Sequence, residues 1–167
     1  EVLRRFKQEA RVSAAINHPG VVQVLDAGTT PEGEPYMIME LLEGESLGSR
    51  LAREPRLTLD EVKWVFGEVL DALAAAHRAG VVHRDLKPDN LFWVESPRPG
   101  LKILDFGLSK LRTRENLNAT RSGMVMGTPL YMAPEQASDA KSVGPVSDLY
   151  ALGARAILVT EIAAARL

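Results

Sequence analysis

The chain has 167 residues, of which 46% are hydrophobic, and a formal net charge of −2. This length and composition suffice for one domain with a single core, and the nearly balanced charge gives no argument for binding nucleic acid or an anionic membrane. The sequence contains no cysteine, which excludes disulfides, thiolate catalysis and cysteine-based zinc sites. It has neither the apolar core of a signal sequence nor an apolar run that could span a bilayer, so a soluble, cytoplasmic chain is expected.

An amphipathic helix is predicted at the start of the chain. Apolar residues recur at helical spacing among charged neighbours until Pro19 and Gly20 interrupt the pattern, so the helix should end near Asn17. Two β-type runs follow, at residues 21–25 and 36–40. The glycines and prolines of the intervening GTTPEGEP indicate a turn, which predicts an antiparallel hairpin beside the helix.

The strongest helix signal lies in the middle of the chain. Thr58 followed by Glu61 is typical of a capping box, and apolar residues then trace one helix face until Gly80. Short strands are predicted at residues 91–94 and 101–104, because β-type residues cluster there.

A long segment containing Gly, Thr and Ser then extends to Glu135. Loops of such length are usually functional or disordered. A last helix is predicted to begin near Val146, where apolar residues again recur at helical spacing.

Two polar segments, VVHRDLKPDN and LKILDFGLSK, carry the candidate chemistry, and each adjoins a β-type run. Asp85 and Asn90 lie five residues apart on one loop, and Asp105 ends a strand just before Gly107. One carboxylate could orient a nucleophile while an amide and a second carboxylate bind a divalent ion, and oxygen ligands suit magnesium. Lys87 could neutralise charge on a transferring phosphoryl group.

Three motifs together resemble the protein kinase family. HRDLKPDN is similar to the catalytic loop of protein kinases, DFG to their magnesium loop, and GTPLYMAPE to the end of their activation segment, and the three occur in the family's order. The resemblance continues through SDLYALG and back to the first helix, and NHPGVVQVLDAG looks like the bacterial branch of the family.

The resemblance implies an α+β, protein-kinase-like fold with two parts. Residues 1–42 would form a truncated small lobe, from the regulatory helix to the hinge, with one helix and short antiparallel strands. Residues 43–167 would form an incomplete, mainly helical large lobe with the catalytic loop, the activation segment and the central helix. The activity implied is transfer of the ATP γ-phosphoryl group to a Ser/Thr hydroxyl of a protein substrate, with Mg²⁺ as the metal.

The resemblance also assigns roles around the phosphoryl group. Asp85 would orient the substrate hydroxyl and accept its proton, while Asn90 and Asp105 would hold magnesium. Lys87 together with Thr128 looks like the pairing that is specific to serine/threonine kinases.

Further residues would bind the nucleotide. Met39, Glu40 and Leu42 fall where the family has its adenine-binding hinge, with Met39 gating the pocket behind it. Phe92 would form part of the apolar floor beneath adenine. Glu9 matches the glutamate that pairs with the ATP-binding lysine, although a solvated helix charge is the alternative.

Regulation in the family depends on the activation segment. Arg84, beside Asp85, suggests activation by a phosphate in that segment. The candidate acceptors are Thr113, Thr120 and Ser122, and the sequence does not choose among them.

Other residues would have structural roles. His83 is expected in the core without chemistry, and His18 and His77 are expected to be structural as well. Asp148 would brace the catalytic loop from below, or would simply favour the helix dipole. The remaining structural residues are Phe106 and Gly107 of the DFG motif, and Glu135, which pairs with a more distant arginine in the family.

The sequence also departs from the family pattern. No glycine-rich loop and no lysine of a VAIK-like strand precede Glu9, and the last helix loses the family's usual continuation. The chain alone is therefore expected to be weakly active or inactive, because positioning contacts would be missing. The alternatives to a fragment of an active kinase are a pseudokinase-like binding module, a truncated non-functional product, and a helical domain unrelated to kinases.

Overall fold

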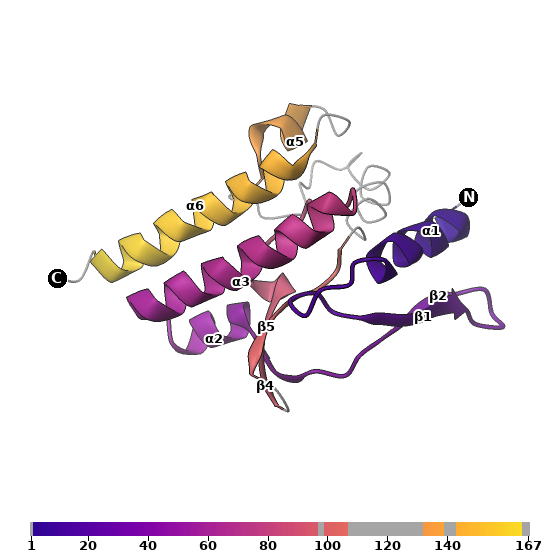
Figure 1. Cartoon of the computed structure of the whole chain (residues 1–167), viewed down its shortest axis with the longest axis horizontal. Helices are drawn as coiled ribbons and strands as arrows, with labels where there is room; N and C mark the ends of the chain where they lie inside the picture. Colours follow the sequence, from indigo (N-terminus) through magenta and orange to yellow (C-terminus); the bar gives the residue numbers. More distant parts are fainter. Residues whose placement is uncertain (1, 97–98, 107–131, 139–142, 165–167) are drawn as a thin grey trace.

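Two antiparallel sheets and two long helices dominate the part of the chain that the computed structural model describes, which is residues 2–96, 99–106, 132–138 and 143–164 (Figure 1). The helices are α1 (Val2–Ala14), α2 (Leu47–Arg53), α3 (Leu59–Arg78), the 3-10 turn η1 (Pro88–Asn90), α5 (Pro134–Ser138) and α6 (Pro145–Ala164). The strands are β1 (Val24–Thr29), β2 (Pro35–Met39), β3 (Glu43–Ser46), β4 (Leu91–Ser96) and β5 (Gly100–Ile103).

The predicted N-terminal helix and hairpin are present as α1, β1 and β2, with shifted boundaries. The helix ends at Ala14, and β1 begins at Val24 rather than at residue 21. The reason is that the backbone before β1 pairs elsewhere: Val22 N donates to Ile103 O (3.1 Å), and Ile103 N donates to Gly20 O (2.8 Å). These bonds attach the end of β5 to the N-terminal part of the chain.

The second sheet has the order β3-β4-β5. Strands β4 and β5 confirm the predictions at residues 91–94 and 101–104, whereas β3 and the following α2 were not predicted. β3 pairs with β4 along its whole length, and Gly44 of β3 has a φ of +146°. A Cβ at Gly44 would collide with the carbonyl oxygen of Trp93, so this close approach of two backbones requires glycine.

Helix α3 confirms the predicted capping box. Thr58 Oγ1 accepts a hydrogen bond from Glu61 N (3.2 Å), and Glu61 Oε2 accepts one from Thr58 N (2.8 Å). The helix face that lies against the core consists of small and branched apolar residues, namely Val65, Val69, Ala72, Leu73 and Ala76.

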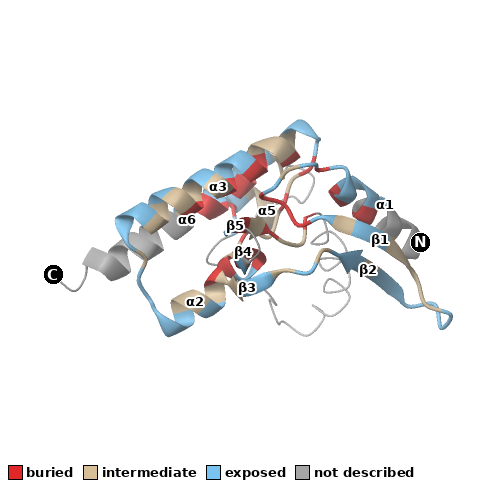
Figure 2. Cartoon of the chain, turned by 60° about the horizontal axis from the view of Figure 1, so that its bottom comes forward, coloured by how far each residue is buried: buried red, intermediate tan, exposed pale blue. Residues whose placement is uncertain are grey.

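Helix α6 lies alongside α3, and the buried residues gather between these helices and the second sheet, whereas β1 and β2 contain only half-buried and exposed residues (Figures 1 and 2). Ala151 and Leu152 of α6 join this core. No described helix combines the length and the apolar character that a membrane crossing needs.

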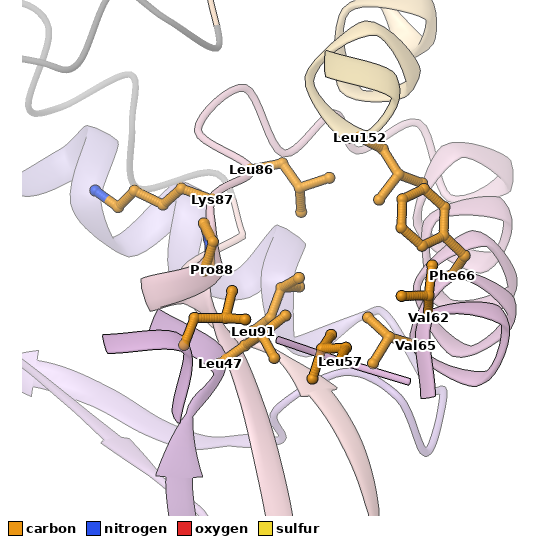
Figure 3. Close-up of a pocket in the computed structure, with 11 residues that line it drawn as sticks. Leu47, Leu57, Val62, Val65, Phe66, Leu86, Lys87, Pro88, Leu91 and Leu152 are labelled. Atoms are coloured by element: carbon orange, nitrogen blue, oxygen red, sulfur yellow. The ribbon is translucent and has the colours of Figure 1, made fainter. Parts of the chain in front are cut away.

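Leu86 fixes the HRDLKPDN segment to the core. It points into an apolar pocket that α3 and α6 line with Val65, Phe66 and Leu152. Lys87 also lines this pocket, but the end of its side chain extends away from it (Figure 3). Leu86 is thus buried in the core between Asp85 and Lys87, which are both partly exposed.

Candidate active site

The backbone of residues 83–85, which we call the HRD segment, is held by helix α6. Arg84 has a φ of 71°, in the left-handed region that residues other than glycine rarely adopt. The buried Asp148 carboxylate accepts hydrogen bonds from the backbone N–H groups of His83 (2.9 Å) and Arg84 (2.8 Å), and its Oδ2 lies 2.8 Å from Nε2 of His77. Asp148 also lies in the first turn of α6, so the contacts to the loop and a favourable helix-dipole interaction coexist.

Asp85 lies between two fixed neighbours. Its Oδ2 is 3.1 Å from Lys87 Nζ and 3.4 Å from Asn90 Nδ2, and Asn90 Nδ2 also donates to the backbone oxygen of Asp85 (2.8 Å). The Asp85 side chain is 42% exposed, whereas Asn90 is buried. The carboxylate is therefore oriented by the protein and remains accessible to a reactant.

Asp105 follows β5 with a φ of 59°, the second left-handed backbone at the site. The preceding residue connects it to the HRDLKPDN segment, because Leu104 N donates to Asn90 O (2.8 Å) and Leu104 O lies 2.8 Å from Nε2 of His83. The two polar segments that the sequence singled out are thus brought together by hydrogen bonds on both sides of Leu104.

His83 is fully buried between these segments. Its Nδ1 accepts a hydrogen bond from Asp85 N (3.2 Å), so its Nε2 carries the hydrogen that is donated to Leu104 O. The ring meets Phe106 edge to face, with centroids 4.8 Å apart. Burial lowers the pKa of His83, although the Leu104 carbonyl and the nearby Asp148, Asp85 and Asp105 oppose that shift.

The predicted hinge residues lie at the end of β2. Met39 lines a small cavity together with Asp105. The Glu40 carboxylate accepts hydrogen bonds from Gln23 N (2.8 Å) and from Lys102 Nζ (2.6 Å). The Glu40 side chain is thus engaged within the protein and joins the two sheets.

Leu42 and Phe92 are both half-buried. Phe92 lies in the middle strand of the second sheet, opposite Ser46 on β3 and Lys102 on β5. Phe92 and Lys102 are therefore paired neighbours in the same sheet.

Several predicted site residues lie outside the described part of the chain. These are Gly107, Thr113, Thr120, Ser122 and Thr128. Glu9 lies on α1, but its side chain is not described.

The two remaining predicted residues have described side chains. Arg84 Nε is buried and has no hydrogen-bond partner among the described residues. Glu135 Oε1 accepts a hydrogen bond from Ser147 Oγ (2.7 Å), and this bond lowers the pKa of Glu135, assisted by a backbone hydrogen bond. Glu135 therefore connects α5 to the start of α6.

Three residues with contacts at the site were not predicted from the sequence. They are Ser13, which donates to the backbone oxygen of Phe106, Lys102, and Gln136, which donates to the backbone oxygen of Arg84. Each partner lies more than fifty residues away in the sequence. The local sequence pattern gives no signal for contacts between residues so far apart in the chain.

A loop held by a buried aspartate of helix α6, with a paired aspartate and a second aspartate after a neighbouring strand, is an arrangement typical of the protein kinase class. The family model described as "Protein kinase domain" matches residues 1–165, and the chain belongs to this family.

Similar curated proteins are bacterial serine/threonine-protein kinases. The chain is 44% identical over 155 residues to Pkn1 of Myxococcus xanthus, with 92% of this chain and 22% of that protein covered. It is 43% identical over 157 residues to PknA of Mycobacterium tuberculosis strain H37Rv, with 92% of this chain and 35% of that protein covered. The chain thus spans about a third or less of the length of these relatives.

Proposed function

We propose that this chain carries the catalytic centre of a serine/threonine protein kinase, which transfers the γ-phosphoryl group of ATP to a protein hydroxyl. The observation that carries the proposal is the accessible Asp85 carboxylate held between Lys87 Nζ and Asn90 Nδ2, in a loop joined by hydrogen bonds to the segment of Asp105. The names of the relatives support the serine/threonine class.

Asp85 accepts the proton of the substrate hydroxyl in this proposal. The hydroxyl oxygen bonds to the γ-phosphorus, and the bond from that phosphorus to the bridging oxygen breaks, so ADP leaves with the electron pair. Lys87 lies beside Asp85 and stabilises negative charge at the transferring group. Thr128 acts with Lys87 in selecting a serine or threonine hydroxyl.

The residues present fit magnesium. The amide nitrogen of Asn90 is engaged with Asp85, which leaves its side-chain oxygen for a cation, and Asp105 supplies a carboxylate. The Asn90 oxygen and the Asp105 carboxylate suit Mg²⁺, which is usually held by one or two protein groups together with phosphates and water. In agreement with so few protein ligands, the described residues contain no group of three or more acidic, histidine or cysteine side chains that could hold a metal ion. Bound magnesium would neutralise charge on the phosphates.

The nucleotide binds between the two parts of the chain in this proposal, with a boundary near residue 42. Met39, Glu40 and Leu42 form the adenine-binding hinge, Phe92 the floor beneath adenine, and Glu9 pairs with the ATP-binding lysine of the family.

Regulation by phosphorylation is part of the same proposal. The buried Arg84 Nε, without a partner among the described residues, supports a role in binding a phosphate. Thr113, Thr120 and Ser122 are the candidate acceptors.

The first test replaces Asp85 with Asn in the protein that carries this chain. We expect phosphoryl transfer to fall by about 10²–10⁴-fold, because the proton acceptor is lost, while Mg-ATP affinity changes little. Asp71→Asn, at an exposed carboxylate of α3, is the matched control. Unchanged turnover in Asp85→Asn contradicts the assignment, and a wild-type protein that binds Mg-ATP but transfers no phosphate is a binding module instead.

A second test concerns the metal. Asp105→Asn removes the carboxylate ligand, so we expect Mg-ATP to bind at least about tenfold more weakly, since changes to metal ligands and to the groups that orient them commonly cost this much. Titration calorimetry with and without magnesium measures the change. An affinity equal to that of the wild type would remove Asp105 from the metal site.

A further inference from the structure

Gln136 joins helix α5 to the catalytic loop. Its Nε2 donates a hydrogen bond to the backbone oxygen of Arg84 (2.8 Å), and its Oε1 accepts one from the backbone N–H of Ala133 (3.1 Å). Both ends of the amide are therefore used, one within its own segment and one on a residue 52 positions earlier in the sequence.

The group that Gln136 contacts is the peptide between Arg84 and Asp85. The carbonyl of this peptide accepts the Gln136 hydrogen bond, and its N–H donates to His83 Nδ1 (3.2 Å). The plane of the peptide is therefore fixed at both ends. That plane sets ψ of Arg84 and φ of Asp85, and hence the direction in which the Asp85 side chain leaves the backbone.

This peptide needs support because Arg84 has a left-handed backbone, which persists only where the surrounding structure enforces it. Asp148 supplies the support on the N-terminal side, through Arg84 N. Gln136 supplies it on the C-terminal side, next to Asp85. The two contacts act on successive peptides and do not replace each other.

We propose that Gln136 is a positioning residue for Asp85: its side-chain N–H holds the Arg84–Asp85 peptide in the orientation that aims the Asp85 carboxylate. This inference rests on the proposed function, because it assigns a role in phosphoryl transfer. It also makes the aim of Asp85 depend on where α5 lies.

The test is the isosteric change Gln136→Glu. The carboxylate keeps the length of the side chain and an acceptor for Ala133 N, but it cannot donate to Arg84 O. We expect kcat to fall by about 10–100-fold, since small misplacements of a catalytic group have effects of this order. We expect KM for ATP to stay within about twofold, because Gln136 contacts no residue assigned to the nucleotide.

A pH profile separates positioning from a structural role. Protonation restores a donor to the carboxyl group of the Gln136→Glu variant, so the kcat of this variant relative to the wild type should rise as the pH falls toward the ordinary carboxyl pKa of about 4.3. Gln136→Met, which has neither donor nor acceptor, should show the loss without this recovery. Gln8→Glu makes the same change at an exposed site on α1 and should leave kcat and its pH profile unaltered.

The outcomes are distinguishable. A wild-type protein without phosphoryl transfer contradicts the proposed function itself. A wild-type protein that transfers phosphate, beside a Gln136→Glu variant with unchanged kcat, overturns only the positioning role. A parallel loss of kcat, ATP affinity and thermal stability without pH recovery would also overturn it, in favour of a purely structural contact.

Discussion

His83 shows how one buried side chain orders the centre of the site. Its Nδ1 accepts from Asp85 N and its Nε2 donates to Leu104 O, so a neutral ring connects the backbone next to each of the two site aspartates. A protonated ring could not accept the Asp85 hydrogen bond and would place a charge in the core. The direction of the pKa shift agrees with this, because burial lowers the pKa of His83.

This lowered pKa predicts a specific loss of stability in acid. The unfolded chain takes up a proton at the ordinary histidine pKa of 6.5, whereas the folded protein resists protonation until lower pH. The contribution of neutral His83 to the free energy of unfolding should therefore be complete above pH 6.5 and should decline below it. Urea unfolding between pH 5 and 8 measures the effect.

The control for that measurement is His83→Gln, which cannot titrate. The difference in unfolding free energy between wild type and variant should shrink as the pH falls below 6.5. A difference that stays constant across this range would show that His83 keeps an ordinary pKa. Glu45, Glu61 and Glu135 do not interfere, because their lowered pKa values lie below the ordinary 4.5, outside this window.

Among the elements, α3 follows most directly from local sequence. Thr58 and Glu61 satisfy each other's backbone N–H groups, and the apolar residues that follow form the face that packs in the core. Thr58→Ala should lower the free energy of unfolding by about 1 kcal/mol through loss of the cap. Chemical denaturation measures this change.

Thr58→Ser is the matched variant for the cap, because its hydroxyl can still accept from Glu61 N. It should recover most of the stability that Thr58→Ala loses. Equal losses in the two variants would assign the effect to the threonine methyl group instead of the hydrogen bond.

Strand β3 and helix α2 show where local sequence fails. β3 has the sequence EGES, which contains no typical strand former, and it is a strand because β4 pairs with it along its length. The seven residues of α2 lack a long apolar repeat, although Ser46 caps the helix by accepting from Ser49 N. Pairing with β4 decides β3, and burial of Leu47 in the core supports α2; the local sequence pattern contains neither contact.

The residues of the candidate site likewise divide into those that the sequence predicts and those that it does not. The motifs singled out Asp85, Asn90 and Asp105 as candidates, because the chemistry and spacing that predict their roles lie within short segments. Gln136 and Lys102 could not be identified, because their contacts at 2.8 Å and 2.6 Å join residues 52 and 62 positions apart. Residues that hold a candidate site in place are thus harder to predict from sequence than residues that carry its motifs.

At the scale of the whole molecule, Lys102 and Glu40 connect the two sheets. Lys102 lies on β5, Glu40 follows β2, and the Glu40 carboxylate also accepts from Gln23 N. The paired side chains are only 20% and 27% exposed, so solvent screens them less than a surface pair. A double-mutant cycle with Lys102→Met and Glu40→Gln should give a coupling free energy of about 1 kcal/mol.

The exposed pair of Lys63 with Asp60, which lies within α3, is the comparison for this cycle. Its coupling should be smaller than that of Lys102 and Glu40. A coupling near zero for Lys102 and Glu40 would show that the backbone bonds between residues 20–22 and Ile103 join the sheets without this ion pair.

The contacts of Asp148 also bear on the order of events during synthesis. His83 and Arg84 emerge from the ribosome 65 and 64 residues before the aspartate that binds their N–H groups. The left-handed backbone of Arg84 therefore lacks one of its two supports until α6 has been made and has docked beside α3. A nascent chain that holds every residue of the HRD segment should therefore lack the final conformation of this loop, and the candidate site should be assembled only when α6 has docked.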